Sequence, residues 1–146
     1  MRDLHSHISV DTAIIPAVVA ADTTPVTIDL ADFDSAELVI QVGIGGINFD
    51  ATNKVEFKLT HSDDDSTYTA VEDADVLGVE TVGTGGIIKS LIEAHPAADA
   101  YRVGYVGGKR YLQLVADFSG THGSPTPLSA VAVKGAPRDT PADDQV

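Results

Sequence analysis

The stretch "VEFKLTHS", residues 55–62, decides the fold class, because its apolar and polar side chains alternate without a break over its first six positions. Val55, Phe57 and Leu59 face one way, and the polar side chains between them face the other. A period of two residues is that of a β-strand with one buried face. The stretch therefore predicts a strand that lies against the hydrophobic core.

Strand-like runs continue on both sides of this one, at 7–15, 25–30, 37–45, 68–71, 101–107, 109–118 and 127–135. The run at 68–71 follows the polar turn "DDDST" and is expected to return as the hairpin partner of 55–62. The runs on either side of Gly107 and Gly108 are expected to form a second hairpin or a bent strand pair.

Helical signals are few. The segment 73–79 is compatible with one turn, and "GGIIKSLIEAH" at 85–95 is compatible with a short helix or a strand, of which we favour the strand. Short strands separated by turn signals predict an all-β protein, a single-domain β-sandwich or barrel with at most one or two short helices. We expect a β domain at 13–135, an extended N-terminal arm at 1–12 and an extended or mobile C-terminal tail at 136–146.

Composition excludes several function classes. The chain of 146 residues has 9 Lys+Arg against 22 Asp+Glu, a net charge of −13, and no cysteine. The negative electrostatic potential of such a chain repels nucleic acid and anionic membranes. The lack of cysteine excludes disulfides, thiol catalysis and Cys-zinc sites. With no long apolar run and no signal-peptide core, we expect a soluble, unprocessed protein.

The motifs that carry chemistry are weak. Ser119 and His122 lie close in a glycine-rich segment, but no G-x-S-x-G elbow is present. The acidic turn 63–65 lacks the glycine and distal glutamate of an EF-hand. The glycine runs at 43–49 and 82–86 lack the strand–turn–helix context of a dinucleotide site. We therefore expect no enzyme activity, no catalytic residue and no cofactor.

His5 and His7 are spaced so that they share a face if they lie on a strand, which is compatible with a metal pair. No third ligand is identifiable, so we interpret this segment as a polar arm and expect no metal site.

The stretch "YVGGKRYLQL", 105–114, combines two glycines with two cations. It is not a phosphate-binding loop, because a strand rather than a helix follows Lys109 and Arg110. We expect the glycines to turn the chain and one cation to pair with a carboxylate such as Asp117 or Glu56. The alternative is a cation that faces a partner, since Arg and Tyr are enriched where proteins meet.

In the strand that follows, Leu112 and Leu114 share one face and Tyr111 lies on the other. We expect the two leucines to belong to the core.

Three motifs occur in order along the chain: K-L-x-x-S-D-D at 58–64, Y-x-G-x-K-R-Y at 105–111 and G-x-P-R-x-x-P at 135–141. On these motifs the chain resembles, over roughly residues 10–141, small structural proteins of tailed bacteriophages and gene-transfer particles. Such proteins are usually considered head decoration, or cement, proteins. The motifs carry no chemistry, so the resemblance implies a place in a virion and no turnover.

The resemblance implies a capsid decoration protein, assembled in the bacterial cytoplasm, that binds the outer surface of the head and bridges capsid subunits. Its expected partners are the major capsid protein and further copies of itself, with a trimer as the guess. A tail or head–tail joining protein and a host-surface or carbohydrate-binding β-sandwich remain alternatives. The residues expected to contact a partner are His5, His7, Ile8, Lys109, Arg110 and Arg138.

Overall fold

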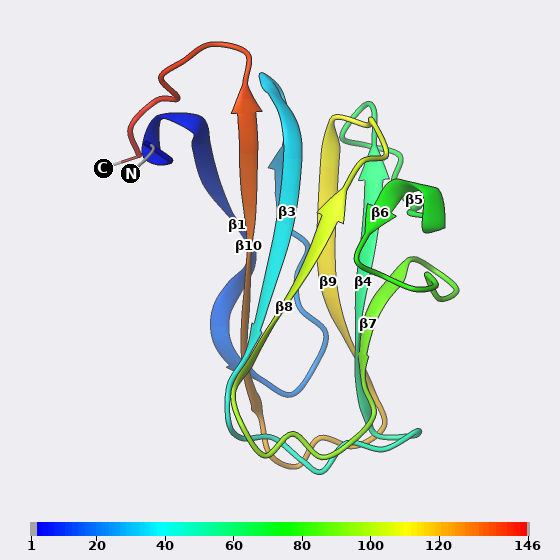
Figure 1. Cartoon of the computed structure of the whole chain (residues 1–146). Helices are drawn as coiled ribbons and strands as arrows, with labels where there is room; N and C mark the ends of the chain where they lie inside the picture. The colour runs from blue at the N-terminus through cyan, green and yellow to red at the C-terminus, as the bar shows by residue number, and fades with distance from the viewer. Residues whose placement is uncertain (1–2, 146) are drawn as a thin grey trace.

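The computed structural model describes residues 3–145 and forms two antiparallel β-sheets packed face to face (Figure 1). In spatial order, sheet A contains β1 (Ile8–Val19), β10 (Thr126–Pro137), β3 (Phe33–Val42), β8 (Asp99–Tyr105) and β6 (Val76–Leu77). Sheet B contains β2 (Thr27–Asp29), β9 (Tyr111–Ser119), β4 (Lys54–Ser62) and β5 (Thr69–Ala70), with β7 (Ile87–Leu91) also paired to β4. The predicted all-β sandwich is confirmed.

Helical structure in the described residues is limited to two single turns of 3-10 helix, η1 (His5–His7) and η2 (Asp73–Asp75). The predicted helical turn within 73–79 is therefore confirmed in its first residues. The segment 85–95, where we favoured a strand over a helix, contains β7. None of the helices in the described part of the chain is long and apolar enough to cross a membrane.

Strand β4 occupies the predicted position, and its alternation places Val55, Phe57 and Leu59 in the core with no exposed surface. It pairs with β9, where Leu112 and Leu114 are also fully buried, as predicted. The inward side chains of β3 and β10 meet these residues from the opposite sheet and complete one core. Burial of each leucine contributes about 1.5–3 kcal/mol, so this shared face holds the layers together.

The hairpin predicted after β4 is present, since Thr69 and Ala70 of β5 pair with His61 and Thr60. The second predicted hairpin is wrong. β8 pairs with β3 and β6 in sheet A, whereas β9 pairs with β2 and β4 in sheet B. The turn at 106–110, in which Gly108 has a φ of 74°, therefore carries the chain from one sheet to the other. β8 pairs along its whole length with β3, and β9 along its whole length with β4, so neither is left to pair with the other.

The first and last described segments of the chain lie close together at one end of the sandwich (Figure 1). β1 begins at Ile8, so residues 8–12 of the expected arm lie in sheet A, and β10 extends into the expected tail as far as Pro137. Residues 1, 2 and 146 of the expected arm and tail lie outside the described residues. The segments beyond the sheets, 3–7 and 138–145, contact each other through a main-chain hydrogen bond from Ala142 N–H to the Ser6 carbonyl, 2.9 Å.

Candidate interaction surfaces

One end of the sandwich gathers three of the residues expected to contact a partner. Lys109 and Arg110, from the turn between β8 and β9, line a groove of about 520 Å³ together with Arg138, which follows β10. The groove is also lined by the turn before β3, residues 30–32, and by Phe33 and Asp34 at the start of β3. Antiparallel pairing brings these elements together, because β8 and β10 end where β9 and β3 begin. The second and third sequence motifs thus meet in space.

The arginines of this groove are held by acids of the same chain. Arg110 makes a bidentate pair with Asp29, Nε to Oδ1 at 2.8 Å and Nη2 to Oδ2 at 2.7 Å. This hydrogen bonding lowers the pKa of Asp29 and raises that of Arg110. Arg138 pairs with Asp34 at 3.1 Å. These pairs orient the guanidinium groups, and part of each group stays exposed to solvent.

The expectation that one of these cations pairs with a carboxylate is confirmed by Arg110 and Asp29, but the examples named for the partner, Asp117 and Glu56, are wrong. Asp117 accepts a hydrogen bond from Lys58, which raises the pKa of that lysine, and Glu56 accepts one from Lys54 at 2.6 Å. Glu56 and Asp117 lie opposite each other in the β4–β9 register, on the outer face of sheet B. The turn that carries Arg110 lies at the end of that sheet and meets different acids.

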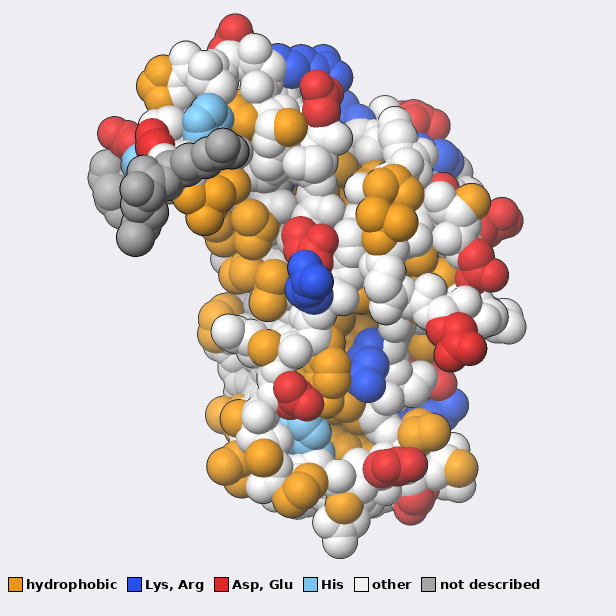
Figure 2. All heavy atoms as spheres, viewed as in Figure 1, with side chains coloured by type: hydrophobic (Ala, Val, Ile, Leu, Met, Phe, Trp, Pro, Cys, Tyr) orange, Lys and Arg blue, Asp and Glu red, His pale blue; other side chains and the backbone are white. Residues whose placement is uncertain are grey.

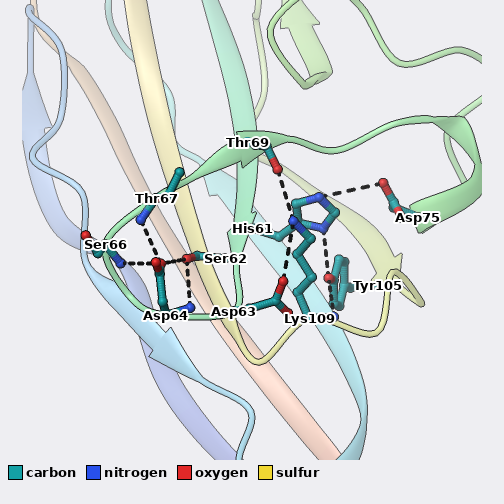
Figure 3. Close-up of polar contacts among 10 residues, drawn as sticks. All are labelled: His61, Ser62, Asp63, Asp64, Ser66, Thr67, Thr69, Asp75, Tyr105 and Lys109. Carbon is teal, nitrogen blue, oxygen red and sulfur yellow. Dashed lines mark hydrogen bonds and ion pairs between the residues drawn. The ribbon is translucent and has the colours of Figure 1, made fainter.

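A buried polar cluster lies beneath the same end and joins the two sheets (Figure 3). His61 is 5% exposed, and its Nδ1 lies 2.9 Å from the Tyr105 hydroxyl. That hydroxyl accepts the main-chain N–H of Lys109 at 3.0 Å, so we assign its proton to the bond with Nδ1. The ring is then neutral, with Nε2–H directed at Asp75, 4.0 Å away. Burial is the main cause that lowers the pKa of His61.

Sequence reasoning gave no role to His61, and it noted Tyr105 only as the first residue of the second motif. The signal was present, because the alternation of Val55, Phe57 and Leu59 continues inward to position 61. A histidine on the core face of a strand needs a hydrogen-bond partner. Its partner is 44 residues away in sequence, on the other sheet.

The acidic turn after β4 has a structural role. Asp64 Oδ1 accepts hydrogen bonds from the Ser62 hydroxyl at 2.8 Å and from the N–H groups of Ser66 and Thr67 at 2.9 and 2.7 Å (Figure 3). These bonds lower the pKa of Asp64 to about 2. The neighbouring Asp63 lies 3.8 Å from Lys109 Nζ, linking this turn to the β8–β9 turn.

The structure places the histidines noted in the sequence in local contacts. Residues 3–145 contain no group of three His, Asp or Glu side chains placed to hold a metal ion. His5 and His7 belong to η1 rather than to a strand, and His5 Nε2 lies 2.9 Å from Asp144 Oδ1. His122 Nε2 meets the main-chain carbonyl of Ser119 at 2.9 Å, so this contact does not involve the serine hydroxyl.

The remaining predicted partner residue, Ile8, opens β1 and pairs with Gly135. His5, His7 and Ile8 therefore lie at the same end of the sheets as Arg138, which follows the last residues of β10.

The two outer faces of the sandwich differ in character. On sheet B the outward side chains of β4 and β9 include the ion pairs Lys54–Glu56 and Lys58–Asp117. On sheet A the outward side chains of β1 and β10 are mostly apolar, including Val10, Ile15, Val18, Pro127, Val131 and Val133. Val39 of β3 lies beside Val131, whereas Ser35, Glu37 and Gln41, which also face outward on β3, are polar. Hydrophobic side chains gather on the β1–β10 side of the molecule, and acidic ones on the opposite margin (Figure 2).

Comparison with family models gave no match to this chain. Comparison with curated proteins also gave no match. Among solved structures, the chain is similar to a protein described as a Bacillus endospore appendage from a family of disulfide-linked pili. The two are 14% identical, the similarity covers 89% of this chain and 88% of the other, and the TM-score is 0.37. Function and assembly are not transferred across a likeness of this degree.

Proposed function

We propose that the protein is a structural component of a phage-like particle, a decoration protein that binds the outside of the head and bridges capsid subunits. The observation that carries the proposal is the contrast between the two outer faces, one lined by ion pairs and the other with a continuous apolar strip on β1 and β10. The resemblance of the three sequence motifs to those of virion proteins suggests the particle as the setting.

The outer face of sheet A is suited to a lasting protein contact. Val131 lies between Thr12 of β1 and Val39 of β3, and Val10 lies beside Val133, so the valines form a continuous surface across three strands. Contiguous exposed apolar surface on a soluble protein marks a site of association. Covering it with a partner removes apolar area from water at about 25 cal/mol per Å².

Two pairs of polar groups on this face are bonded to each other. Arg102 Nη1 lies 3.7 Å from Glu37 Oε1, and the Ser129 hydroxyl donates to Gln41 Oε1 at 3.2 Å. A partner that covers the face therefore leaves these groups with their existing partners and pays a smaller desolvation cost. The charged face of sheet B remains toward water.

A decoration protein needs no turnover, and we propose that this one has no enzymatic role. Two polar side chains from segments considered in the sequence are engaged in structural contacts, Asp64 with its own turn and His122 with a main-chain carbonyl, and the buried His61 is bonded to Tyr105. Binding only to the assembled shell stabilises that shell by mass action. We propose the major capsid protein and further copies of this chain as partners, with no direct contact to nucleic acid or membrane.

The proposal is tested by a tagged copy located on particles by negative-stain microscopy, together with a matched pair of variants. Val131→Glu places a charge on the outer face of sheet A, and Val115→Glu places one on the outer face of sheet B. We expect tag density on heads, loss of head binding with Val131→Glu alone, and rupture of undecorated heads at lower temperature. Density confined to the tail or neck would replace the decoration role with a tail or joining role, and equal binding by both variants would exclude this face.

A further inference from the structure

We propose that the C-terminal segment, residues 139–145, is an exchangeable arm that binds the free edge of β1 on a second copy of the chain. The inference deepens the proposed function and rests on it for the setting in which copies are crowded together. Its structural basis is the way this segment already occupies that edge within one chain.

β1 is an outer strand of sheet A and pairs with β10 on one side only. On its other side, the Gln145 side chain makes two hydrogen bonds to Val10: Val10 N–H donates to Oε1, and Nε2 donates to the Val10 carbonyl, both at 2.8 Å. These are the donor and acceptor that a neighbouring strand would engage. The amide of Gln145 thus stands in for the peptide group of a pairing strand.

Only the first part of this edge suits strand pairing. From Ile8 to Thr12 the register with β10 is regular, whereas two register shifts and Pro16 interrupt the rest of β1. Proline and bulges blunt an edge against pairing. The site that receives the arm is therefore a short segment of the β1 edge centred on Val10.

The arm is attached weakly beyond a firm base. At the base, Arg138 N–H donates to the Asp32 carbonyl at 2.8 Å, and its side chain pairs with Asp34. Beyond the base, besides Gln145, the contacts include the Ala142–Ser6 hydrogen bond and the His5–Asp144 pair, whose side chains are each 74% exposed. Exposed pairs of this kind contribute about 0–1 kcal/mol.

A groove of about 380 Å³ separates part of the arm from the sheet, with Ser9 and Phe33 on one wall and Ala142 and Asp143 on the other. Besides its tip and base, the arm is held at the buried Ala142, while the other described residues of 139–145 are exposed. Seven residues, when extended, span at most about 23–25 Å, enough to reach across a contact between two sandwiches.

We propose that the arm comes from a second copy of the chain, because the β1 edge around Val10 is complementary to this chain's own arm. Exchange replaces each contact within a chain by the same contact between chains, as in domain swapping. The equilibrium between the monomer, with its arm on its own β1, and the arm-exchanged dimer then depends on the local concentration of the chain. That concentration is high where copies lie side by side on a particle.

The absence of cysteine from the chain allows a direct test. Ser9→Cys and Asp143→Cys introduce single thiols on the two walls of the groove, at positions outside the core. The two variants carry tags of different size and are mixed over a range of concentrations, then treated with a short thiol-specific crosslinker. We expect a mixed crosslinked dimer whose yield rises with concentration and falls severalfold when Gln145→Glu is added to the Asp143→Cys copy.

The control pairs Ser9→Cys with Ser124→Cys, an exposed position in the turn before β10, at the other end of that strand. A mixed dimer no more abundant than in this control, or crosslinks of a Ser9→Cys/Asp143→Cys double variant that stay within one chain at every concentration, would overturn the proposal. Because the experiment needs no heads, its failure leaves the proposed decoration role standing, and failure of head binding leaves arm exchange standing.

Discussion

The hydroxyl of Tyr105 lies 2.9 Å from Nδ1 of His61, and this hydrogen bond joins β8 of sheet A to β4 of sheet B. The same hydroxyl accepts the N–H of Lys109, so one phenol links both layers and the turn between them. This end of the sandwich carries Lys109, Arg110 and Arg138, the groove-lining residues expected to contact a partner. The positions of these groove-lining residues therefore depend on the buried hydrogen bond between Tyr105 and His61 beneath them.

Removing the phenolic oxygen should weaken the fold at this end. Tyr105→Phe leaves His61 Nδ1 and the Lys109 N–H without their partner, which costs about 1–3 kcal/mol in the free energy of unfolding. Urea denaturation measures the loss. Tyr68→Phe is the control, since the Tyr68 hydroxyl meets exposed partners, Asp65 and Thr27, and its loss should cost less than about 0.5 kcal/mol. Equal effects in the two variants would contradict the structural role of Tyr105.

His61 should make stability depend on pH. Burial lowers its pKa in the folded state, so the unfolded chain binds a proton first, near the ordinary value of 6.5. The free energy of unfolding should therefore fall as the pH drops below about 6.5 and level off below the folded pKa. The charged groups that face the ring are Asp75, Lys109, Asp63 and Glu72, and burial outweighs their combined effect.

The measurement is urea denaturation at a series of pH values, for the wild type and for His61→Gln, which cannot titrate at this position. The variant should lose the part of the pH dependence that His61 supplies. Parallel profiles for the two proteins would show that His61 is not the group responsible.

Leu114 should be essential to the core. It is fully buried on β9, so Leu114→Ala removes a side chain from between the sheets and is expected to cost about 2–5 kcal/mol. Val115→Ala, one residue further on and on the outer face, should cost less than about 1 kcal/mol. Thermal and chemical unfolding compare the two, and a loss below about 0.5 kcal/mol for Leu114→Ala would show that this strand is not core.

Gly85 and Gly86 offer a matched pair before β7. Both have positive φ, 81° and 84°, so alanine is strained at either position by about 1–2 kcal/mol. A Cβ at Gly86 would also lie 2.2 Å from the Leu59 carbonyl oxygen, whereas one at Gly85 meets nothing within 4 Å. Gly86→Ala should therefore be the more destabilising by over about 1 kcal/mol, as measured by urea denaturation. Equal losses would mean that the backbone here moves to accept the side chain.

The alternation in residues 55–62 was sufficient to predict β4, the side of it that enters the core, and with its neighbours an all-β sandwich. Local pattern carries this information because the period of a strand and the burial of one face act residue by residue. For the same reason Leu112 and Leu114 could be assigned to the core from sequence alone.

Only the tertiary structure decided which strands pair and which charges meet. Gly107 and Gly108 indicate a turn, but a turn does not specify whether the chain returns to the same sheet, and here it crosses to the other. Arg110 pairs with Asp29, 81 residues away in sequence, and His61 is hydrogen-bonded to Tyr105, 44 residues away. Val10 likewise meets Gln145 across 135 residues. Such partners are set by the packing of two sheets and by the pairing register, which depend on the whole chain at once.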